Sequence, residues 1–168
     1  MNTENTVRPR TDDDLTACAE ALAEVHRHDG YPVNWPENPG DWLTRAAGLG
    51  AWVAVLDGRI AGHVALDRGD EDDLAPGLWG DTAATAVVSR LFVAPEARGH
   101  GVGVRLMERA VAEARRRDLH PVLDVVASDS GAVALYERLG WRLLATVEQR
   151  WSPEQTVTVR CYAAPAAV

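Results

Sequence analysis

The segment Ser-Arg-Leu-Phe-Val-Ala-Pro-Glu-Ala-Arg-Gly-His-Gly-Val-Gly, residues 89–103, joins an apolar run to a glycine-rich turn. The apolar run at 88–93 is rich in β-branched and aromatic residues and predicts a strand, which Pro95 ends. The amphipathic pattern of 102–117 predicts a helix directly after the glycines. A helix N-terminus presents unpaired N–H groups and partial positive charge, and Arg98 adds a guanidinium suited to phosphate oxygens. The junction therefore predicts a phosphate-binding loop.

The glycine spacing separates this loop from two common nucleotide-binding loops. A Walker A loop requires Gly-Lys-Ser/Thr, and the chain contains no lysine. A dinucleotide-binding loop requires Gly-x-Gly-x-x-Gly, whereas Gly99, Gly101 and Gly103 alternate with single residues and Val104 occupies the third-glycine position. A glycine-rich turn that binds no ligand remains the alternative.

A second informative segment is Asp-Ser-Gly-Ala-Val-Ala-Leu-Tyr-Glu-Arg-Leu-Gly-Trp at 129–141, which follows a predicted strand at 121–127. Asp129 or Ser130 can cap the helix that its apolar residues predict over 132–139. This segment is therefore predicted to run from a strand through a capped turn into a helix.

Together the two segments resemble the signatures of the GNAT superfamily of acyl-CoA-dependent N-acyltransferases. The matching residues are Arg98, Gly101 and Gly103 in the loop, and Ala132, Leu135, Tyr136 and Gly140 in the second segment. Trp141 stands in place of the usual Phe of the family, and Asp129 stands in place of its Asn. The resemblance is strong over 85–142 and weak over the first 80 residues.

The resemblance implies an α/β fold with one mixed, twisted sheet, in the order β-α-α-β-β-β-α-β-α-β-β, as a single GNAT-like N-acetyltransferase domain over 1–168. The residue pattern agrees with that order. Strands are predicted at 7–9, 51–56, 59–66, 88–93, 121–127, 141–151 and 156–162, one helix is predicted to begin at Thr11, and further helices at 41–47, 102–117 and 132–139. The acidic stretch 67–73 and the residues up to Asp81 are predicted to form a solvated loop. In the family, the strands that correspond to 88–93 and 121–127 diverge and admit the pantetheine arm of the coenzyme.

The resemblance also implies that the donor substrate is acetyl-CoA and that no metal is needed. Backbone groups of Leu91 and Val93 are expected to pair with pantetheine, and the N–H groups of 98–103 to hold the pyrophosphate. The full expected coenzyme site consists of Leu91, Phe92, Val93, Arg98, Gly99, His100, Gly101, Val102, Gly103, Asp129, Ala132 and Tyr136. Asp129 can cap a helix as well as Asn does, but its carboxylate supplies no amide donor to a coenzyme.

The implied reaction is direct attack of a neutral amine on the acyl thioester in a ternary complex. A backbone N–H near Phe92 or Val93 would stabilise the oxyanion, and Tyr136 would act as the general acid for the leaving thiolate. Several family members carry a glutamate at the position of Ser89, whose hydroxyl can orient a water but cannot act as a base near neutral pH. His63, on a predicted strand, is a candidate base because the reference pKa of histidine is near neutrality.

Asp81 and Glu148 are further candidates, so the base stays unassigned. The missing glutamate and the change at Asp129 keep a second interpretation open, a non-catalytic GNAT-like module that binds acyl-CoA for regulation.

Composition excludes several other classes of function. The length of 168 residues, with 46% hydrophobic and 25% charged residues, suits one globular domain without a membrane span. A net charge of -8 argues against nucleic-acid binding. Cys18 and Cys161 are too few for a disulfide framework or a zinc site, and the polar first ten residues lack a signal core. We therefore expect a cytoplasmic monomer or homodimer.

The acceptor side is less specific than the donor side. Trp35, Trp42 and Trp79 lie in or beside predicted loops, where they could line an acceptor pocket or cover the sheet beneath the loops. The acidic stretch 67–73 would attract a cationic amine. These features favour a primary amine of a small molecule or a peptide and do not separate the two.

Overall fold

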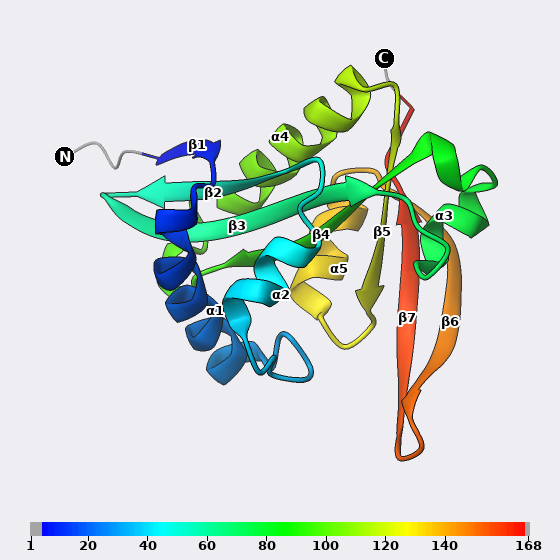
Figure 1. Cartoon of the computed structure of the whole chain (residues 1–168), viewed down its shortest axis with the longest axis horizontal. Helices are drawn as coiled ribbons and strands as arrows, with labels where there is room; N and C mark the ends of the chain where they lie inside the picture. The colour runs from blue at the N-terminus through cyan, green and yellow to red at the C-terminus, as the bar shows by residue number, and fades with distance from the viewer. Residues whose placement is uncertain (1–4, 167–168) are drawn as a thin grey trace. The chain divides into compact units, whose positions relative to one another are not determined.

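The computed structural model describes residues 5–166, which contain seven strands and five α-helices. The order along the chain is β1-α1-α2-β2-β3-α3-β4-α4-β5-α5-β6-β7 (Figure 1). The strands are β1 (Asn5–Pro9), β2 (Gly50–Leu56), β3 (Arg59–Arg68), β4 (Thr85–Val93), β5 (His120–Val126), β6 (Arg142–Ser152) and β7 (Gln155–Ala163). The helices are α1 (Leu15–Asp29), α2 (Pro39–Arg45), α3 (Leu74–Trp79), α4 (Val102–Arg116) and α5 (Ser130–Arg138).

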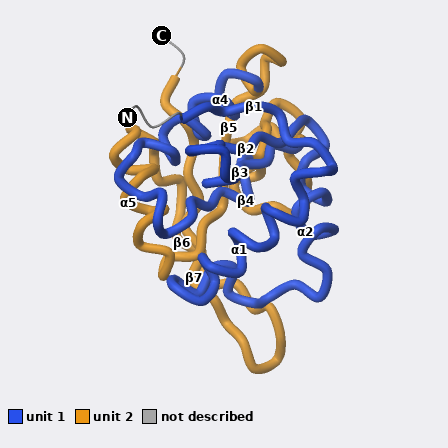
Figure 2. The backbone as a smooth tube through the Cα atoms, turned by 90° about the vertical axis from the view of Figure 1, so that its left-hand side faces the viewer, with its two compact units in different colours: residues 1–67, 88–113 blue, residues 68–87, 114–168 orange. Residues whose placement is uncertain are grey.

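The strands form one mixed sheet with the hydrogen-bonded order β1-β2-β3-β4-β5-β7-β6. β4 and β5 pair in parallel, whereas β1 with β2, β2 with β3, β5 with β7, and β6 with β7 pair antiparallel. This arrangement confirms the predicted α/β class with a mixed sheet. The chain divides into two compact units, residues 1–67 with 88–113 and residues 68–87 with 114–168 (Figure 2). The expectation of a single domain stays a prediction.

The first unit has helices on both faces of its strands (Figure 1). Val53 of β2 lies opposite His63 of β3 in the antiparallel register, so the two side chains share the face that α1 and α2 cover. Gly62 faces the other way, toward α4, because successive strand residues alternate between faces. A Cβ built on Gly62 would lie 3.1 Å from Val102 Cγ1.

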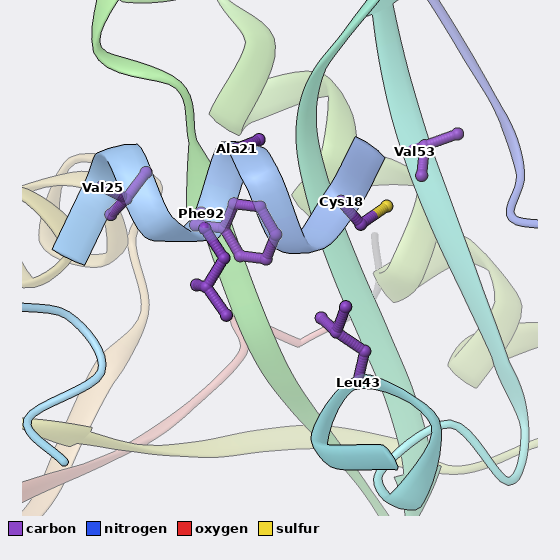
Figure 3. Packing of buried hydrophobic residues seen from close by; sticks show 7 residues of the cluster. Cys18, Ala21, Val25, Leu43, Val53 and Phe92 are labelled. Carbon is purple, nitrogen blue, oxygen red and sulfur yellow. The ribbon is translucent and has the colours of Figure 1, made fainter. Parts of the chain in front are cut away.

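The core of the first unit is built around α1. Its buried residues recur at the three- and four-residue spacing of one helix face: Cys18, Ala21, Leu22 and Val25. They pack with Leu43 of α2, Val53 of β2 and Phe92 of β4 (Figure 3). Phe92 therefore anchors the end of β4 in this core, directly before the glycine loop.

The second unit has a sheet face covered by α3 and another face that carries α5. Val122, Val159 and Cys161 form a buried cluster with Ala75 of α3. The alternate residue Tyr162 points to the opposite face, and its ring centroid lies 6.1 Å from that of Tyr136 on α5. The parallel pairing of β4 with β5 covers only Thr85–Val87 and His120–Val122, all within this unit.

Helix α3 corrects the predicted order, which placed no helix between the third and fourth strands. The sequence predicts a solvated loop over 74–79, but these residues form a helix of six residues. Its first N–H groups, those of Leu74 and Ala75, donate to the carboxylate of Asp124 on β5, each at 2.9 Å. This cap comes from fifty residues away, so no local pattern indicates it.

Within residues 5–166 no helix is long and apolar enough to cross a membrane.

Candidate active site

The glycine loop leads from β4 into α4 through a single 3₁₀ turn at Pro95–Ala97. Gly99 and Gly101 have φ values of 85° and 71°, which side-chain-bearing residues rarely adopt. The first helical hydrogen bond joins the Arg105 N–H to the Gly101 carbonyl at 3.2 Å. The N–H groups of the preceding turn therefore have no carbonyl of their own helix to which to donate. Such a turn can hold an anion with backbone donors alone.

Arg98, the expected phosphate ligand, is held by a carboxylate at the end of α1. Its guanidinium donates through both terminal nitrogens to Asp29, with Nη1 3.2 Å from Oδ1 and Nη2 close to Oδ2. Nη2 also donates to the Val93 carbonyl at 3.3 Å. The hydrogen bond from Arg98 lowers the pKa of Asp29 to about 2, and His28 contributes in the same direction. The cation is thus already positioned beside the loop, paired with an anion that a phosphate could replace.

β4 contains a backbone irregularity just before the loop. Arg90 has φ 54°, an outlier for a long side chain inside a strand. The guanidinium of Arg90 lies 4.1 Å from the centre of the Trp42 ring, and its Nε donates to the Trp42 carbonyl at 3.2 Å. Ser89, Leu91 and Val93 are partly exposed, whereas the Phe92 side chain is buried. Side-chain contact with a ligand is therefore excluded for Phe92 but not for its neighbours.

His63 lies on β3, as the sequence predicts, and is fully buried. Its Nδ1 lies 2.9 Å from the Arg90 carbonyl oxygen, and its Nε2 lies 2.9 Å from Nη1 of Arg10. Its ring stacks on Phe92, with centroids 5.3 Å apart and planes inclined by 12°. Burial lowers the pKa of His63 to about 4, and the nearby cations Arg10 and Arg90 add to the effect. The imidazole is therefore neutral at neutral pH.

In the second unit, α5 carries the residues of the second signature. Asp129 is the N-cap residue of α5, and its carboxylate accepts from the Ala132 N–H at 3.4 Å, which confirms the predicted capping role. Tyr136 is buried, and its ring packs near those of Trp141 and Tyr162 at centroid distances of 6.0 and 6.1 Å. The hydroxyl of Tyr162 is buried and has no hydrogen-bond partner among residues 5–166.

The remaining candidates lie in separate parts of the chain. Asp81 caps the 3₁₀ turn before β4 by accepting from the Ala83 N–H at 3.2 Å. Glu148 lies on β6. Trp79 ends α3, where its ring stacks on His120 with centroids 3.9 Å apart. Trp35 and Trp79 are both exposed. Within 5–166, no group of three or more His, Cys, Asp or Glu side chains could hold a metal ion.

Sequence reasoning missed three residues that shape this region. Asp29 pairs with Arg98, Arg10 binds His63, and Gly62 lets β3 approach β4 closely. A Cβ on Gly62 would lie 2.8 Å from the Phe92 carbonyl oxygen, closer than real Cβ contacts allow. Of these three residues, only Gly62 could have been identified from the sequence. An isolated glycine inside a predicted strand often marks a close approach of another backbone segment.

This chain is similar to a known protein family and to curated relatives. A family model described as the acetyltransferase (GNAT) family matches residues 13–141. An uncharacterized N-acetyltransferase of Methanocaldococcus jannaschii is 29% identical over 141 residues, which cover 81% of this chain and 60% of that protein. This chain therefore spans less than two thirds of that relative's length.

Solved structures with the same fold include yncA from Salmonella typhimurium with its cofactor acetyl-CoA, and the ribosomal-protein-S18-alanine N-acetyltransferase from Escherichia coli. The first has a TM-score of 0.69 at 19% identity, over 95% of this chain and 92% of that one. The second has a TM-score of 0.72 at 18% identity, over 98% of this chain and 96% of that one. These likenesses show the fold, and the family model covers more than half of the sequence. The chain belongs to the acetyltransferase (GNAT) family.

Proposed function

We propose that this chain is an N-acetyltransferase that transfers an acetyl group from acetyl-CoA to a primary amine by direct attack in a ternary complex. The observation that carries the proposal is the 98–103 loop, which contains two glycines at positive φ and the Arg98 guanidinium. It leads into the first turn of α4, whose N–H groups have no carbonyl of their own helix to which to donate. The yncA structure contains acetyl-CoA, and the M. jannaschii relative is named an N-acetyltransferase. Family membership and loop geometry support the same donor here.

The coenzyme assignment depends mainly on backbone groups. The pyrophosphate is assigned to the N–H groups of 98–103 and to the Arg98 guanidinium, once it leaves Asp29. The pantetheine amides are assigned to the backbone of Leu91 and Val93. Phe92 contributes through its backbone alone, because its side chain is in the core. Asp129 and Ala132 stay assigned to the coenzyme through the second signature.

The proposed chemistry forms a bond between the amine nitrogen and the thioester carbonyl carbon. The carbon–sulfur bond then breaks, and the leaving thiolate takes a proton from the Tyr136 hydroxyl, which is protonated at neutral pH. A backbone N–H at Phe92 or Val93 stabilises the oxyanion. The amine loses its proton to a water that Ser89 orients. Asp81 and Glu148 are the other candidates to take this proton.

The acceptor is proposed to be a primary amine of a small molecule or a peptide. Asp70, Glu71 and Asp72 are exposed and form a run of negative charge that attracts cations.

A cytoplasmic location is also proposed. Cys18 and Cys161 are both free thiols, which suits the reducing cytoplasm.

Calorimetry with acetyl-CoA and thiol release across a panel of amines and peptides test the proposal. Binding with turnover supports it. Binding without release of thiol with any acceptor contradicts it in favour of the regulatory acyl-CoA-binding module. Absence of binding at millimolar acetyl-CoA contradicts both interpretations.

The loop assignment predicts different outcomes for the same substitution at two matched glycines. Gly101 and Gly58 have φ values of 71° and 79°, and neither would bring a Cβ within 4 Å of a neighbouring atom. Alanine at either position therefore costs a similar amount of stability, about 1 kcal/mol. Only Gly101→Ala is expected to weaken acetyl-CoA binding, by about tenfold or more, as measured by calorimetry. Equal affinities of the two variants would contradict the loop assignment.

Tyr136 and Tyr162 provide a second matched pair. Tyr136→Phe removes the proposed acid and is expected to lower kcat by about 10²-fold, with an acetyl-CoA KM close to that of the wild type. Tyr162→Phe removes a buried hydroxyl that has no partner within 5–166, so it should leave kcat unchanged and raise stability by up to about 1 kcal/mol. Initial rates and urea unfolding check both, and a wild-type kcat for Tyr136→Phe would remove it from the mechanism.

A further inference from the structure

The unusual backbone at Arg90 requires support from its surroundings. A side-chain-bearing residue with φ 54° inside a strand is unfavourable and persists only where other contacts hold it. The buried side chain of His63 supports the carbonyl of Arg90, because His63 Nδ1 lies 2.9 Å from its oxygen. Such irregularities re-aim the strand residues that follow them. Here the residues that follow are 91–93, which carry the proposed pantetheine and oxyanion contacts.

The two neighbours of His63 fix its protonation and tautomer. A carbonyl oxygen only accepts, so Nδ1 must carry the proton that it donates to Arg90. A guanidinium only donates, so Nε2 must be unprotonated to accept from Arg10. Arg10 is itself fixed, since its Nη1 also donates to the Leu43 carbonyl at 3.2 Å. Both nitrogens of the imidazole are therefore occupied, and neither is available to take a proton from an amine.

The packing around His63 holds the ring in this orientation. The ring stacks on Phe92, two residues beyond Arg90, and Phe92 is anchored in the cluster under α1. On the opposite face, Gly62 allows the Phe92 carbonyl to approach β3 closely. His63 and Gly62 thus contact the same segment of β4 from two sides.

We propose that His63 is a positioning residue that holds the left-handed backbone at Arg90 and so aims the N–H and C=O groups of 91–93 at the acyl-CoA. The assignment rests on the proposed acetyltransferase function. It gives His63 a role different from that of general base, and the two roles predict different results for the same variants.

The discriminating variants are His63→Asn and His63→Leu. An Asn side chain can present an N–H where Nδ1 stands, and so can still donate to the Arg90 carbonyl, whereas Leu can donate to nothing. Positioning predicts that His63→Asn keeps kcat and the acetyl-CoA KM within about threefold of the wild type, while His63→Leu loses about tenfold or more in kcat/KM. If His63 is instead the general base, both variants should lose kcat equally, and the pH profile of kcat should lose its acidic limb. That result, or a wild-type kcat/KM for His63→Leu, overturns the proposal.

The backbone at Arg90 offers a test that remains valid if His63→Leu folds poorly. Arg90→Gly and Arg90→Ala remove the same side chain, but only glycine adopts positive φ without strain. The loss in kcat/KM caused by His63→Leu, or by His63→Ala where the Leu variant folds poorly, should be smaller beside Arg90→Gly than beside Arg90→Ala. Equal losses in the two backgrounds contradict the proposal, because simple core packing of His63 would not depend on the φ preference at residue 90.

Hydrogen exchange separates this inference from the proposed function. In the full chain without ligand, His63→Leu should raise amide exchange in 90–94 by about tenfold or more, while His63→Asn should not. His120→Leu is the control, since it removes another histidine-to-carbonyl bond, that from Nε2 to Ala164 at 3.0 Å. If the wild type turns over no acceptor, the function fails, but exchange in 90–94 still tests His63. Unchanged exchange in His63→Leu overturns the inference even in an active enzyme.

Discussion

Arg98 has two competing anions in the proposed enzyme, the carboxylate of Asp29 and the pyrophosphate of the coenzyme. The pair with Asp29 is partly exposed, so its contribution to stability is small, but it holds the guanidinium beside the loop. The folded pKa of Asp29, about 2, lies below its ordinary value near 3.8, so the pair stabilises the fold above pH 4 and loses that contribution as the pH falls toward 2.

Asp29→Asn is therefore expected to release Arg98 to the coenzyme. Removal of the competing carboxylate and its charge should tighten acetyl-CoA binding by about threefold to tenfold at low salt. Calorimetry measures the change, and Glu24→Gln is the control because it removes one exposed negative charge from the same helix. Equal affinities of the two variants would show that Asp29 does not compete. Weaker binding in Asp29→Asn would mean that the carboxylate orients Arg98 for the phosphate.

Helix α3 depends on a contact that joins distant parts of the sequence. Asp124 accepts from the Leu74 and Ala75 N–H groups, and α3 in turn carries Trp79, whose ring stacks on His120. Asp124→Ala leaves two helix N–H groups without this acceptor and should cost about 1–3 kcal/mol of unfolding free energy.

Urea unfolding measures the loss for Asp124→Ala. Asp73→Ala is the matched control. It lies directly before α3, but its side chain makes no capping hydrogen bond to that helix. If Asp73→Ala is as costly as Asp124→Ala, the distant cap does not determine the helix.

Most elements could be predicted because their signals are local. The neighbouring strands β2 and β3, the helix that follows the glycine loop and the Asp129 cap each depend on residues within a few positions of one another. α3 could not be predicted, because its cap is on β5. The loop and the tyrosine segment were recognisable for the same reason as the local elements, whereas the contacts of His63 with Arg10 and Arg90 join residues 53 and 27 positions away.

His63 should make the stability of the fold depend on pH between about 6.5 and 4. Its folded pKa, about 4, lies below the ordinary value near 6.5, because burial disfavours the charged ring. Between these values the unfolded chain binds a proton that the folded chain excludes. The contribution is complete above pH 6.5 and is lost as the pH falls toward 4, at up to about 1.4 kcal/mol per pH unit. His120, whose pKa is also lowered by burial, adds to the same trend.

Urea unfolding of the wild type and of His63→Asn at several pH values between 4 and 7 tests this expectation. Because Asn does not titrate, the unfolding free energy of the variant should depend less steeply on pH. The slope should fall by up to about 1.4 kcal/mol per pH unit, the value for one proton. His28→Asn is the control, since it removes an exposed histidine from the end of α1. A wild-type slope in His63→Asn would mean that His63 is protonated in the folded state. An imidazolium would require both ring nitrogens to donate, and the Arg10 guanidinium 2.9 Å from Nε2 cannot accept. The same measurement therefore tests the neutral state of His63 on which its contacts with Arg10 and Arg90 depend.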